Sequence, residues 1–294
     1  MKPLILLLAV TFSSCGQVRY QDDIRSSAIF KNTEIWDLAQ AADEGSVDNF
    51  SRLASENPGK LDVQDERYGM TLLMWCVKME KYEMAKALLE RKANPNIRSK
   101  TGKTALFYAT EFSWLDNEAN ADPKYVALLL QFGADPNRPY AGSDNSNLID
   151  KGTSPLIHAV SRSFPKVKAL VEGGADINYK TERNWTAASE ALLSREVDVA
   201  YYLIVENKAA VTAPFYFYKA GSDSIDYADT RYPVELLRNW VFDLGSEEHN
   251  KKMEIVAEFS RQGADYWKTS PGKATLRHIK ERYPDTWEEY VRRY

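Results

Sequence analysis

The chain has 294 residues, of which 44% are hydrophobic and 27% are charged, and its formal net charge is −4 at pH 7. Such a composition excludes a wholly disordered chain, because it provides enough apolar surface to build a substantial core. A slightly acidic balance also argues against binding to nucleic acid, which requires clustered Lys and Arg side chains. Only two cysteines, Cys15 and Cys76, are present, too few for a disulfide framework once the first is assigned to lipid attachment below.

The first segment, residues 1–15, reads MKPLILLLAVTFSSC and has the pattern of a secretory signal peptide: a positive start followed by a short apolar run. The apolar run is too short to cross a bilayer, which takes about 20 residues. Its end, Phe12-Ser13-Ser14-Cys15, resembles the lipobox of bacterial lipoproteins. The resemblance implies that Cys15 is acylated (palmitate or a similar chain) and becomes the first residue after cleavage. The alternative is a plain signal peptide with an incidental cysteine.

Gly16 follows this cysteine, where lipoproteins retained in the inner membrane commonly have Asp, so the resemblance implies an outer-membrane anchor facing the periplasm. Residues 16–31 are polar and have no clear period, which predicts a tether. We therefore expect four parts: a signal peptide over 1–14, the lipidated cysteine and tether over 15–32, a repeat domain over 33–268 and a helical cap over 269–294.

The body of the chain repeats two short motifs in alternation. The first has a small or polar residue three positions before a hydrophobic pair, and it recurs as Gly69-Met70-Thr71-Leu72-Leu73, Gly102-Lys103-Thr104-Ala105-Leu106, Gly152-Thr153-Ser154-Pro155-Leu156 and Asn184-Trp185-Thr186-Ala187-Ala188. The second recurs as Ala93-Asn94-Pro95-Asn96, Gly133-Ala134-Asp135-Pro136-Asn137 and Gly174-Ala175-Asp176-Ile177-Asn178.

Together the two motifs resemble the ankyrin-repeat family, with a spacing of 33 residues from Gly69 to Gly102. The resemblance implies an all-α solenoid of about six helix-turn-helix repeats, with two extended hairpin fingers and a C-terminal helical cap. The first repeat is degenerate and contains Ala41-Ala42-Asp43-Glu44-Gly45 as its helix–turn signature. No helix pair can bury its apolar face alone, so stacked neighbours must share one core.

Local chemistry agrees with this arrangement. Thr71, Thr104, Ser154 and Thr186 stand where a helix N-cap needs a side-chain oxygen. Gly133 and Gly174 stand where second helices end. The family often has His after its Pro-Leu pair, but these positions hold Met74, Phe107, Ile157 and Ser189, and His158 comes one position later. We therefore expect contacts between repeats to be mostly apolar.

Two repeats are too long, and their insertions fall at the hairpin position. One finger, residues 138–151, contains Ala141-Gly142-Ser143-Asp144, and the other, residues 212–231, contains Ala220-Gly221-Ser222-Asp223. Insertions in repeat proteins often form the binding face, and aromatic side chains are favoured at interfaces. The predicted partner contacts on the fingers are Tyr140, Asp144, Phe215, Tyr216, Tyr218 and Asp223. The alternative is that the aromatic side chains pack on the neighbouring repeat.

Inner-helix positions before the turn of each repeat are exposed in this family, which adds Phe112, Trp114 and Arg162 to the predicted partner contacts. The alternative for Trp114 is that it only holds the insertion 114–122 in place. An acidic, aromatic concave face would suit the plugging of an enzyme cleft.

Nothing in the sequence indicates catalysis. His158, His249 and His278 are far apart, no spacing fits a metal site, and no phosphate or dinucleotide motif occurs, so we expect no catalytic residue, metal or cofactor. Cys76 stands at a small core position and is predicted to be buried. The resemblance implies a module that binds a protein partner and no nucleic acid. Ankyrin lipoproteins of this build resemble immunity proteins that accompany type VI secretion effectors, notably lipases. The alternative is an envelope scaffold that holds a resident protein.

Overall fold

The structure is a computed structural model, and it describes residues 24–111, 122–142, 149–220 and 224–294. A short 3-10 helix, η1 (Ser27–Phe30), comes first. Six helix pairs follow: α2 (Trp36–Glu44) and α3 (Val47–Glu56), α4 (Leu72–Lys78) and α5 (Tyr82–Glu90), α6 (Ala105–Ala109) and α7 (Lys124–Gln131), α8 (Pro155–Ala159) and α9 (Phe164–Glu172), α10 (Ala187–Ser194) and α11 (Val197–Tyr201), α12 (Pro233–Arg238) and α13 (Glu247–Arg261). The π-helical turn η3 (Tyr202–Glu206) extends α11, and α14 (Lys273–Arg282) with α15 (Trp287–Arg293) ends the chain.

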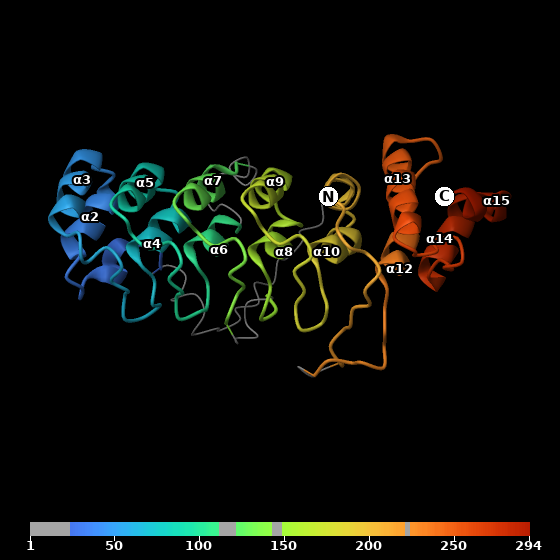
Figure 1. Cartoon of the computed structure of the whole chain (residues 1–294), viewed down its shortest axis with the longest axis horizontal. Coiled ribbons are helices and arrows are strands. Elements are labelled where there is room, and N and C mark those ends of the chain that lie inside the picture. The colour runs from blue at the N-terminus through green and yellow to red at the C-terminus, as the bar shows by residue number, and fades with distance from the viewer. Residues whose placement is uncertain (1–23, 112–121, 143–148, 221–223) are drawn as a thin grey trace, which may run out of the picture.

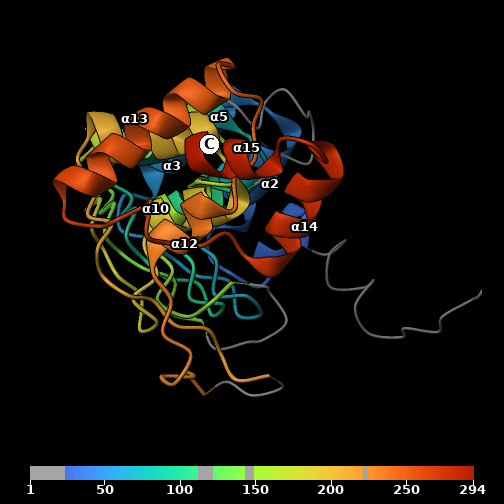
Figure 2. The ribbon, with the colours of Figure 1, turned by 90° about the vertical axis from the view of Figure 1, so that its right-hand side faces the viewer.

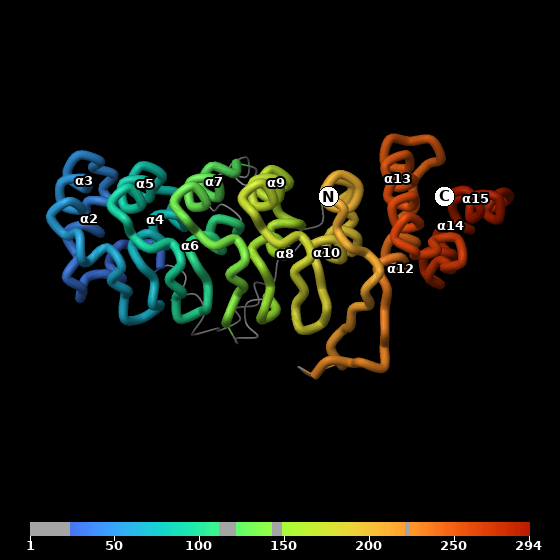
Figure 3. The backbone as a smooth tube through the Cα atoms, in the orientation of Figure 1, coloured from blue at the N-terminus to red at the C-terminus, as the bar shows by residue number. Residues whose placement is uncertain are grey.

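The helix pairs stack side by side in chain order, so that the molecule is an elongated solenoid (Figure 1). First helices pack on first helices, as α4 does on α6, and second helices pack on second helices, as α5 does on α7. The backbone trace shows the connecting loops hanging from one edge of the row, below the helices (Figure 3). The sequence-based expectation of an all-α ankyrin solenoid is confirmed by this arrangement.

One continuous hydrophobic core runs through the stack from Phe30 to Tyr266. A second, small cluster of Ile279, Tyr290 and Tyr294 holds α14 against α15. Because each repeat completes the core of its neighbour, removing one repeat would expose the apolar faces of two others.

The predicted N-caps are all formed. The side-chain oxygens of Thr71, Thr104, Ser154 and Thr186 each accept a hydrogen bond from the backbone N–H three residues later. Each bond satisfies an amide that the first turn of a helix leaves without a partner. These four residues therefore fix where the inner helices α4, α6, α8 and α10 begin.

The Gly-Ala-Asp-x-Asn turn after the outer helix also behaves as predicted. Gly133 has a φ of +82° and Gly174 a φ of +87°, a left-handed conformation that favours glycine. The following residues close the helices, since Ala134 N–H donates to the Leu129 carbonyl and Ala175 N–H to the Leu170 carbonyl, at 2.9 Å in each case.

The last residue of that turn forms a polar ladder between repeats that we did not predict. The Asn96 side chain accepts a bond from the Asp135 N–H at 2.8 Å and donates to the Gly133 carbonyl at 2.9 Å. Asn137 repeats both contacts on the next turn, with the Asp176 N–H at 2.6 Å and the Gly174 carbonyl at 3.1 Å. His158 adds a buried polar contact between repeats, its Nδ1 lying 2.7 Å from Thr110 Oγ1. The expectation of mostly apolar contacts therefore overlooked a regular polar component.

Replacing Asn137 with Ala is expected to lower the free energy of unfolding by about 1–2 kcal/mol, because two hydrogen bonds between neighbouring repeats disappear together. Urea unfolding followed by circular dichroism measures the loss. Asn32→Ala serves as the control, since Asn32 is exposed and its side chain makes no hydrogen bond in the described part of the chain. Equal stabilities for the two variants would show that the ladder does not couple the repeats.

A buried cluster of basic side chains and aromatic rings closes the C-terminal end of the stack. Lys252 on α13 is completely buried, and its side-chain nitrogen donates a hydrogen bond to the Trp240 carbonyl at 2.7 Å. The same nitrogen lies 3.9 Å from the ring centroid of Tyr294. Arg238 on α12 lies over the Tyr294 ring from another direction, at 4.4 Å, and donates to the Tyr294 carbonyl at 3.1 Å. The terminal helices are thus attached by polar and cation–π contacts as well as by apolar packing.

Candidate protein-binding surface

The finger between α11 and α12 is the most prominent loop of the molecule, and Figure 2 shows it projecting well below the helices. It begins as two antiparallel segments that pair at Phe215 with Arg231 and at Tyr218 with Ile225. Backbone hydrogen bonds of 2.8 Å join the Phe215 N–H to the Arg231 carbonyl and the Lys219 N–H to the Ser224 carbonyl. The described part of this insertion is therefore a hairpin with a defined register.

Two predicted partner contacts turn out to be core residues. Phe215 is 1% exposed and lies edge to face with Trp185 at 4.7 Å. Tyr140, also 1% exposed, lies 5.6 Å from the Phe107 ring, and its backbone pairs with Gly152 and Thr153. The prediction that these two side chains contact a partner is wrong, because each one packs its finger against the stack.

The other aromatic side chains of the long finger are exposed, except for Tyr216, which is half-buried. Tyr227 is 65% exposed and its ring meets that of Tyr216 edge to face at 5.0 Å. Four of the eight large hydrophobic side chains that are exposed in the described part of the chain lie in this finger or directly after it: Phe217, Tyr218, Tyr227 and Tyr232. Aromatic side chains gathered at one exposed place mark an interaction surface, whereas single exposed ones do not. We call these four residues with Tyr216 the aromatic finger.

Arg183 joins the aromatic finger to the body of the stack. Its carbonyl accepts the Tyr216 N–H at 3.0 Å, and its guanidinium lies 4.7 Å over the Tyr218 ring. The guanidinium also forms an ion pair with Asp150, from the other finger. Its Nε–H is buried and has no hydrogen-bond partner among the described residues. One arginine therefore fixes the position of both insertions relative to each other.

A small cavity of about 160 Å³ lies beside Arg183, between the end of the first finger and the inner helices α8 and α10. Its lining residues are Ile149, Asp150, Thr153, Ile157, His158, Ser161, Arg162, Arg183, Trp185 and Glu190. Pockets for cofactors and small-molecule ligands generally measure about 300–1,000 Å³, so this cavity has room for a side chain of a protein partner. The predicted contact Arg162 is half-buried in the wall, where desolvation lowers the pKa of its guanidinium.

The described surface around the cavity is not acidic as expected. Arg162 and Arg183 stand against Asp150 and Glu190 in the cavity wall. Just outside the two ends of α6, Glu111 pairs with Lys103 at 2.5 Å. Positive and negative side chains alternate on this surface. It therefore offers hydrogen-bond donors and acceptors at fixed positions and has no electrostatic potential of one sign.

Nothing among the described residues forms a metal site, since no three His, Cys, Asp or Glu side chains gather there. Cys76 is fully buried, which confirms its assignment to the core, and this burial raises the pKa of its thiol. His158 is held neutral, because burial lowers the pKa of its imidazole well below the ordinary value. No helix in the described part of the chain is long and apolar enough to cross a bilayer.

Five predicted site residues, Cys15, Phe112, Trp114, Asp144 and Asp223, lie outside the described residues. Sequence reasoning missed Arg183, Tyr227 and Tyr232. The last two were available as aromatic residues inside or beside the second insertion, whereas no local signal marks Arg183 as the link between both fingers.

The fold and this surface define an α-helical repeat protein of the class that binds other proteins. Comparison with known families agrees: the family model for ankyrin repeats, which describes three copies, matches residues 38–140 and 119–214. The chain belongs to the ankyrin-repeat family, and it is a protein–protein interaction module.

Proposed function

We propose that the chain is a lipid-anchored protein of the bacterial envelope that binds and blocks a secreted protein toxin, as an immunity protein does for a type VI effector such as a lipase. The observation that carries the binding part is the aromatic finger, which lies beside a cavity of side-chain size. Exposed aromatic side chains cost little entropy to immobilise and dominate interface energetics.

The polar wall of the cavity supports blocking of a partner's active site better than catalysis by the chain itself. Asp150, Arg183, Arg162 and Glu190 are held by contacts with the repeats, so they form a rigid set of polar groups that could replace the substrate of a partner enzyme. Rigid presentation lowers the entropic cost of association, which favours tight binding.

The proposed location at a membrane of the bacterial envelope is based on the sequence of residues 1–15. A lipobox-like ending at Cys15 places several acyl chains on one residue, and multiple chains anchor a protein stably where one is marginal. An anchored inhibitor would meet a toxin delivered into the periplasm before the toxin reaches its membrane substrate.

Capture of partners from periplasmic extract with the full chain tests the proposal. We expect one secreted protein to be retained, and a chain with residues 212–231 replaced by a short glycine linker to retain none. The captured protein, exported to the periplasm, should kill cells that lack the chain and spare cells that have it. A retained protein that is harmless and resident in the envelope would favour the scaffold function instead.

A further inference from the structure

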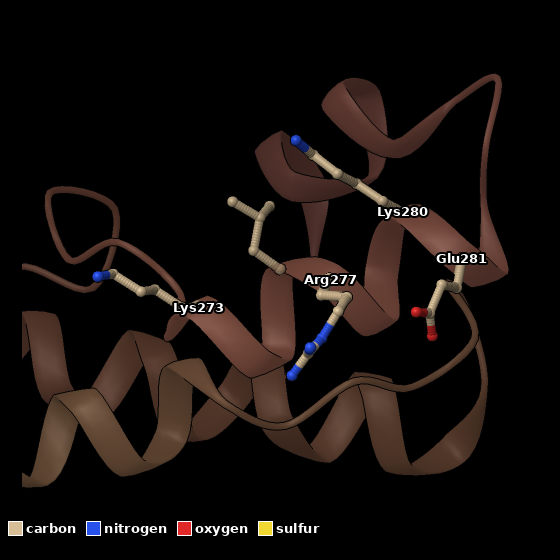
Figure 4. A pocket seen from close by; sticks show the side chains of 5 residues that line it. Lys273, Arg277, Lys280 and Glu281 are labelled. Atoms are coloured by element: carbon tan, nitrogen blue, oxygen red, sulfur yellow. The ribbon is translucent and has the colours of Figure 1, made fainter.

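The terminal helix α14 presents a basic face to solvent. Lys273, Arg277 and Lys280 follow the i, i+4, i+7 spacing of one helix face, and all three are exposed. Figure 4 shows these side chains with Glu281 on α14. They border a shallow open hollow of about 420 Å³, whose remaining lining residue is the half-buried Leu276. We call Lys273, Leu276, Arg277 and Lys280 the basic face.

Within the described part of the chain, the cations of the basic face form no ion pair with a carboxylate, whereas neighbouring cations do. On the same three terminal helices, Lys251, Arg282 and Arg293 are each within 3.0 Å of an Asp or Glu oxygen. Among the described residues, no carboxylate lies within 4.0 Å of the three cations of the basic face. Lys280 instead lies 4.2 Å over the Trp287 ring on α15. The three cations outnumber Glu281, the one carboxylate that lines the hollow, so this face keeps a positive charge.

The orientation of α14 is fixed by its opposite side. Ile279 is fully buried against Tyr290 and Tyr294. The Thr275 hydroxyl donates to Asn239 Oδ1 at 2.7 Å, and Arg282 pairs with Asp243 at 2.9 Å. Helix α14 lies beyond α13, at the opposite end of the row from α2 (Figure 1), and to one side of the downward projection of the long finger (Figure 2). A ligand on the basic face would thus leave the aromatic finger accessible.

We propose that the basic face docks on the anionic phospholipid headgroups of the membrane to which the chain is anchored. The three charged groups spread along the helix and do not converge on one point (Figure 4). This spread suits a plane of many phosphates better than one compact anion. Leu276 between the cations and Trp287 beside them are side chains that enter the interfacial region of a bilayer.

The expected binding of the basic face to the membrane is weak, but it is sufficient for a chain that an anchor already holds near the surface. Each Lys or Arg near an anionic membrane surface strengthens binding about fivefold, so three together give about a hundredfold. Weak contacts of this size become occupied when an anchor already holds the chain near the surface. Docking would lay the solenoid along the membrane. The inference rests on the proposed function only for the presence of that membrane.

Vesicle sedimentation of the full chain carrying Cys15→Ser tests the docking without the acyl anchor. The measured quantity is the ratio of binding to phosphatidylcholine vesicles containing phosphatidylglycerol over binding to phosphatidylcholine vesicles alone. Residues 1–15, which include the cation Lys2, are the same in every variant, so a difference in this ratio between variants isolates the charges that were changed. We expect Lys273→Glu, Arg277→Glu and Lys280→Glu combined to reduce the ratio at least tenfold, and added salt to reduce it in the parent chain.

Two matched variants control the experiment. Lys273→Arg with Lys280→Arg keeps the charges and should keep the ratio. Lys31→Glu, Lys151→Glu and Lys180→Glu combined make the same change in net charge at exposed sites outside α14 and should have a small effect. An equal fall in the ratio for both charge-reversal triples, or no fall for the α14 triple with an intact circular dichroism melt, would overturn the proposal. Acylation of Cys15 is measured separately by fatty-acid labelling, so its failure is distinguishable from failure of the basic face.

Discussion

We expect the free energy of unfolding to depend on pH near neutrality because of Lys252, which is buried at the C-terminal end of the stack. Replacing Lys252 with Met should remove most of this dependence. Burial lowers the pKa of the Lys252 ammonium to about 6, whereas a lysine in the unfolded chain has a pKa of about 10.4. Between these values the unfolded state binds one more proton than the folded state, so the free energy of unfolding rises with pH. Below about pH 6 both states are protonated, and the folded state bears the full cost of burying the charge.

The slope for one such group is at most about 1.4 kcal/mol per pH unit. We therefore expect the stability difference between Lys252→Met and the parent chain to shift by about 3 kcal/mol, in favour of the parent, between about pH 6.5 and pH 9. Loss of the bond to the Trp240 carbonyl, which is 2.7 Å long, shifts the whole curve of the variant and leaves its slope unchanged. Urea unfolding at a series of pH values measures both quantities.

Lys251→Met is the matched control on the neighbouring residue. The Lys251 ammonium lies 2.7 Å from both Asp198 and Glu247, and hydrogen bonding to these carboxylates raises its pKa. It stays protonated in both states over the tested range, so its curve should run parallel to that of the parent chain. A parallel curve for Lys252→Met as well would mean that the Tyr294 and Tyr266 rings keep the buried amine charged, and the proposed titration would be refuted.

The regular part of the fold was predictable because its signals are local. A cap such as Thr104 needs only the chain that follows it, and Gly133 needs only a turn whose φ is positive. Both signals recur once per repeat, which separates them from chance matches. Asn96 and Asn137 recur at the same position of the second motif, so the sequence shows the residues of the ladder. Their hydrogen-bond partners, however, lie about 40 residues away in the chain, on the turn of the next repeat. Its function therefore appears only in three dimensions.

The candidate site was less predictable because it lies in insertions that do not follow the repeat. Phe215 and Tyr218 stand in one run of aromatic residues, yet one is buried and the other exposed. Successive side chains of a hairpin strand point to opposite faces, and this alternation determines that Phe215 is buried and Tyr218 exposed. A shift of one residue in the strand register would exchange the two positions. Arg183 belongs to the repeat but contacts both fingers, so its importance depends on how two irregular loops meet.

Tyr227→Ala combined with Tyr218→Ala should weaken binding of the captured partner about 30-fold or more, which corresponds to a hot spot of about 2 kcal/mol. Tyr227 is 65% exposed and Tyr218 also faces solvent, so their truncation removes little apolar contact within the chain. The free energy of unfolding should therefore stay within about 0.5 kcal/mol of the parent value. Phe215→Ala should behave in the opposite way and lower stability by about 3–4 kcal/mol, because it opens a cavity against Trp185.

Binding measured by calorimetry and stability measured by urea unfolding separate the two kinds of aromatic residue. Trp267→Ala controls for the loss of an exposed aromatic side chain outside the finger, and it should leave partner binding unchanged. If the double tyrosine variant binds as tightly as the parent chain, the aromatic finger is not the interface. If it unfolds as readily as Phe215→Ala, Tyr218 and Tyr227 support the hairpin itself, since Tyr218 also lies under the Arg183 guanidinium and Tyr227 against Tyr216.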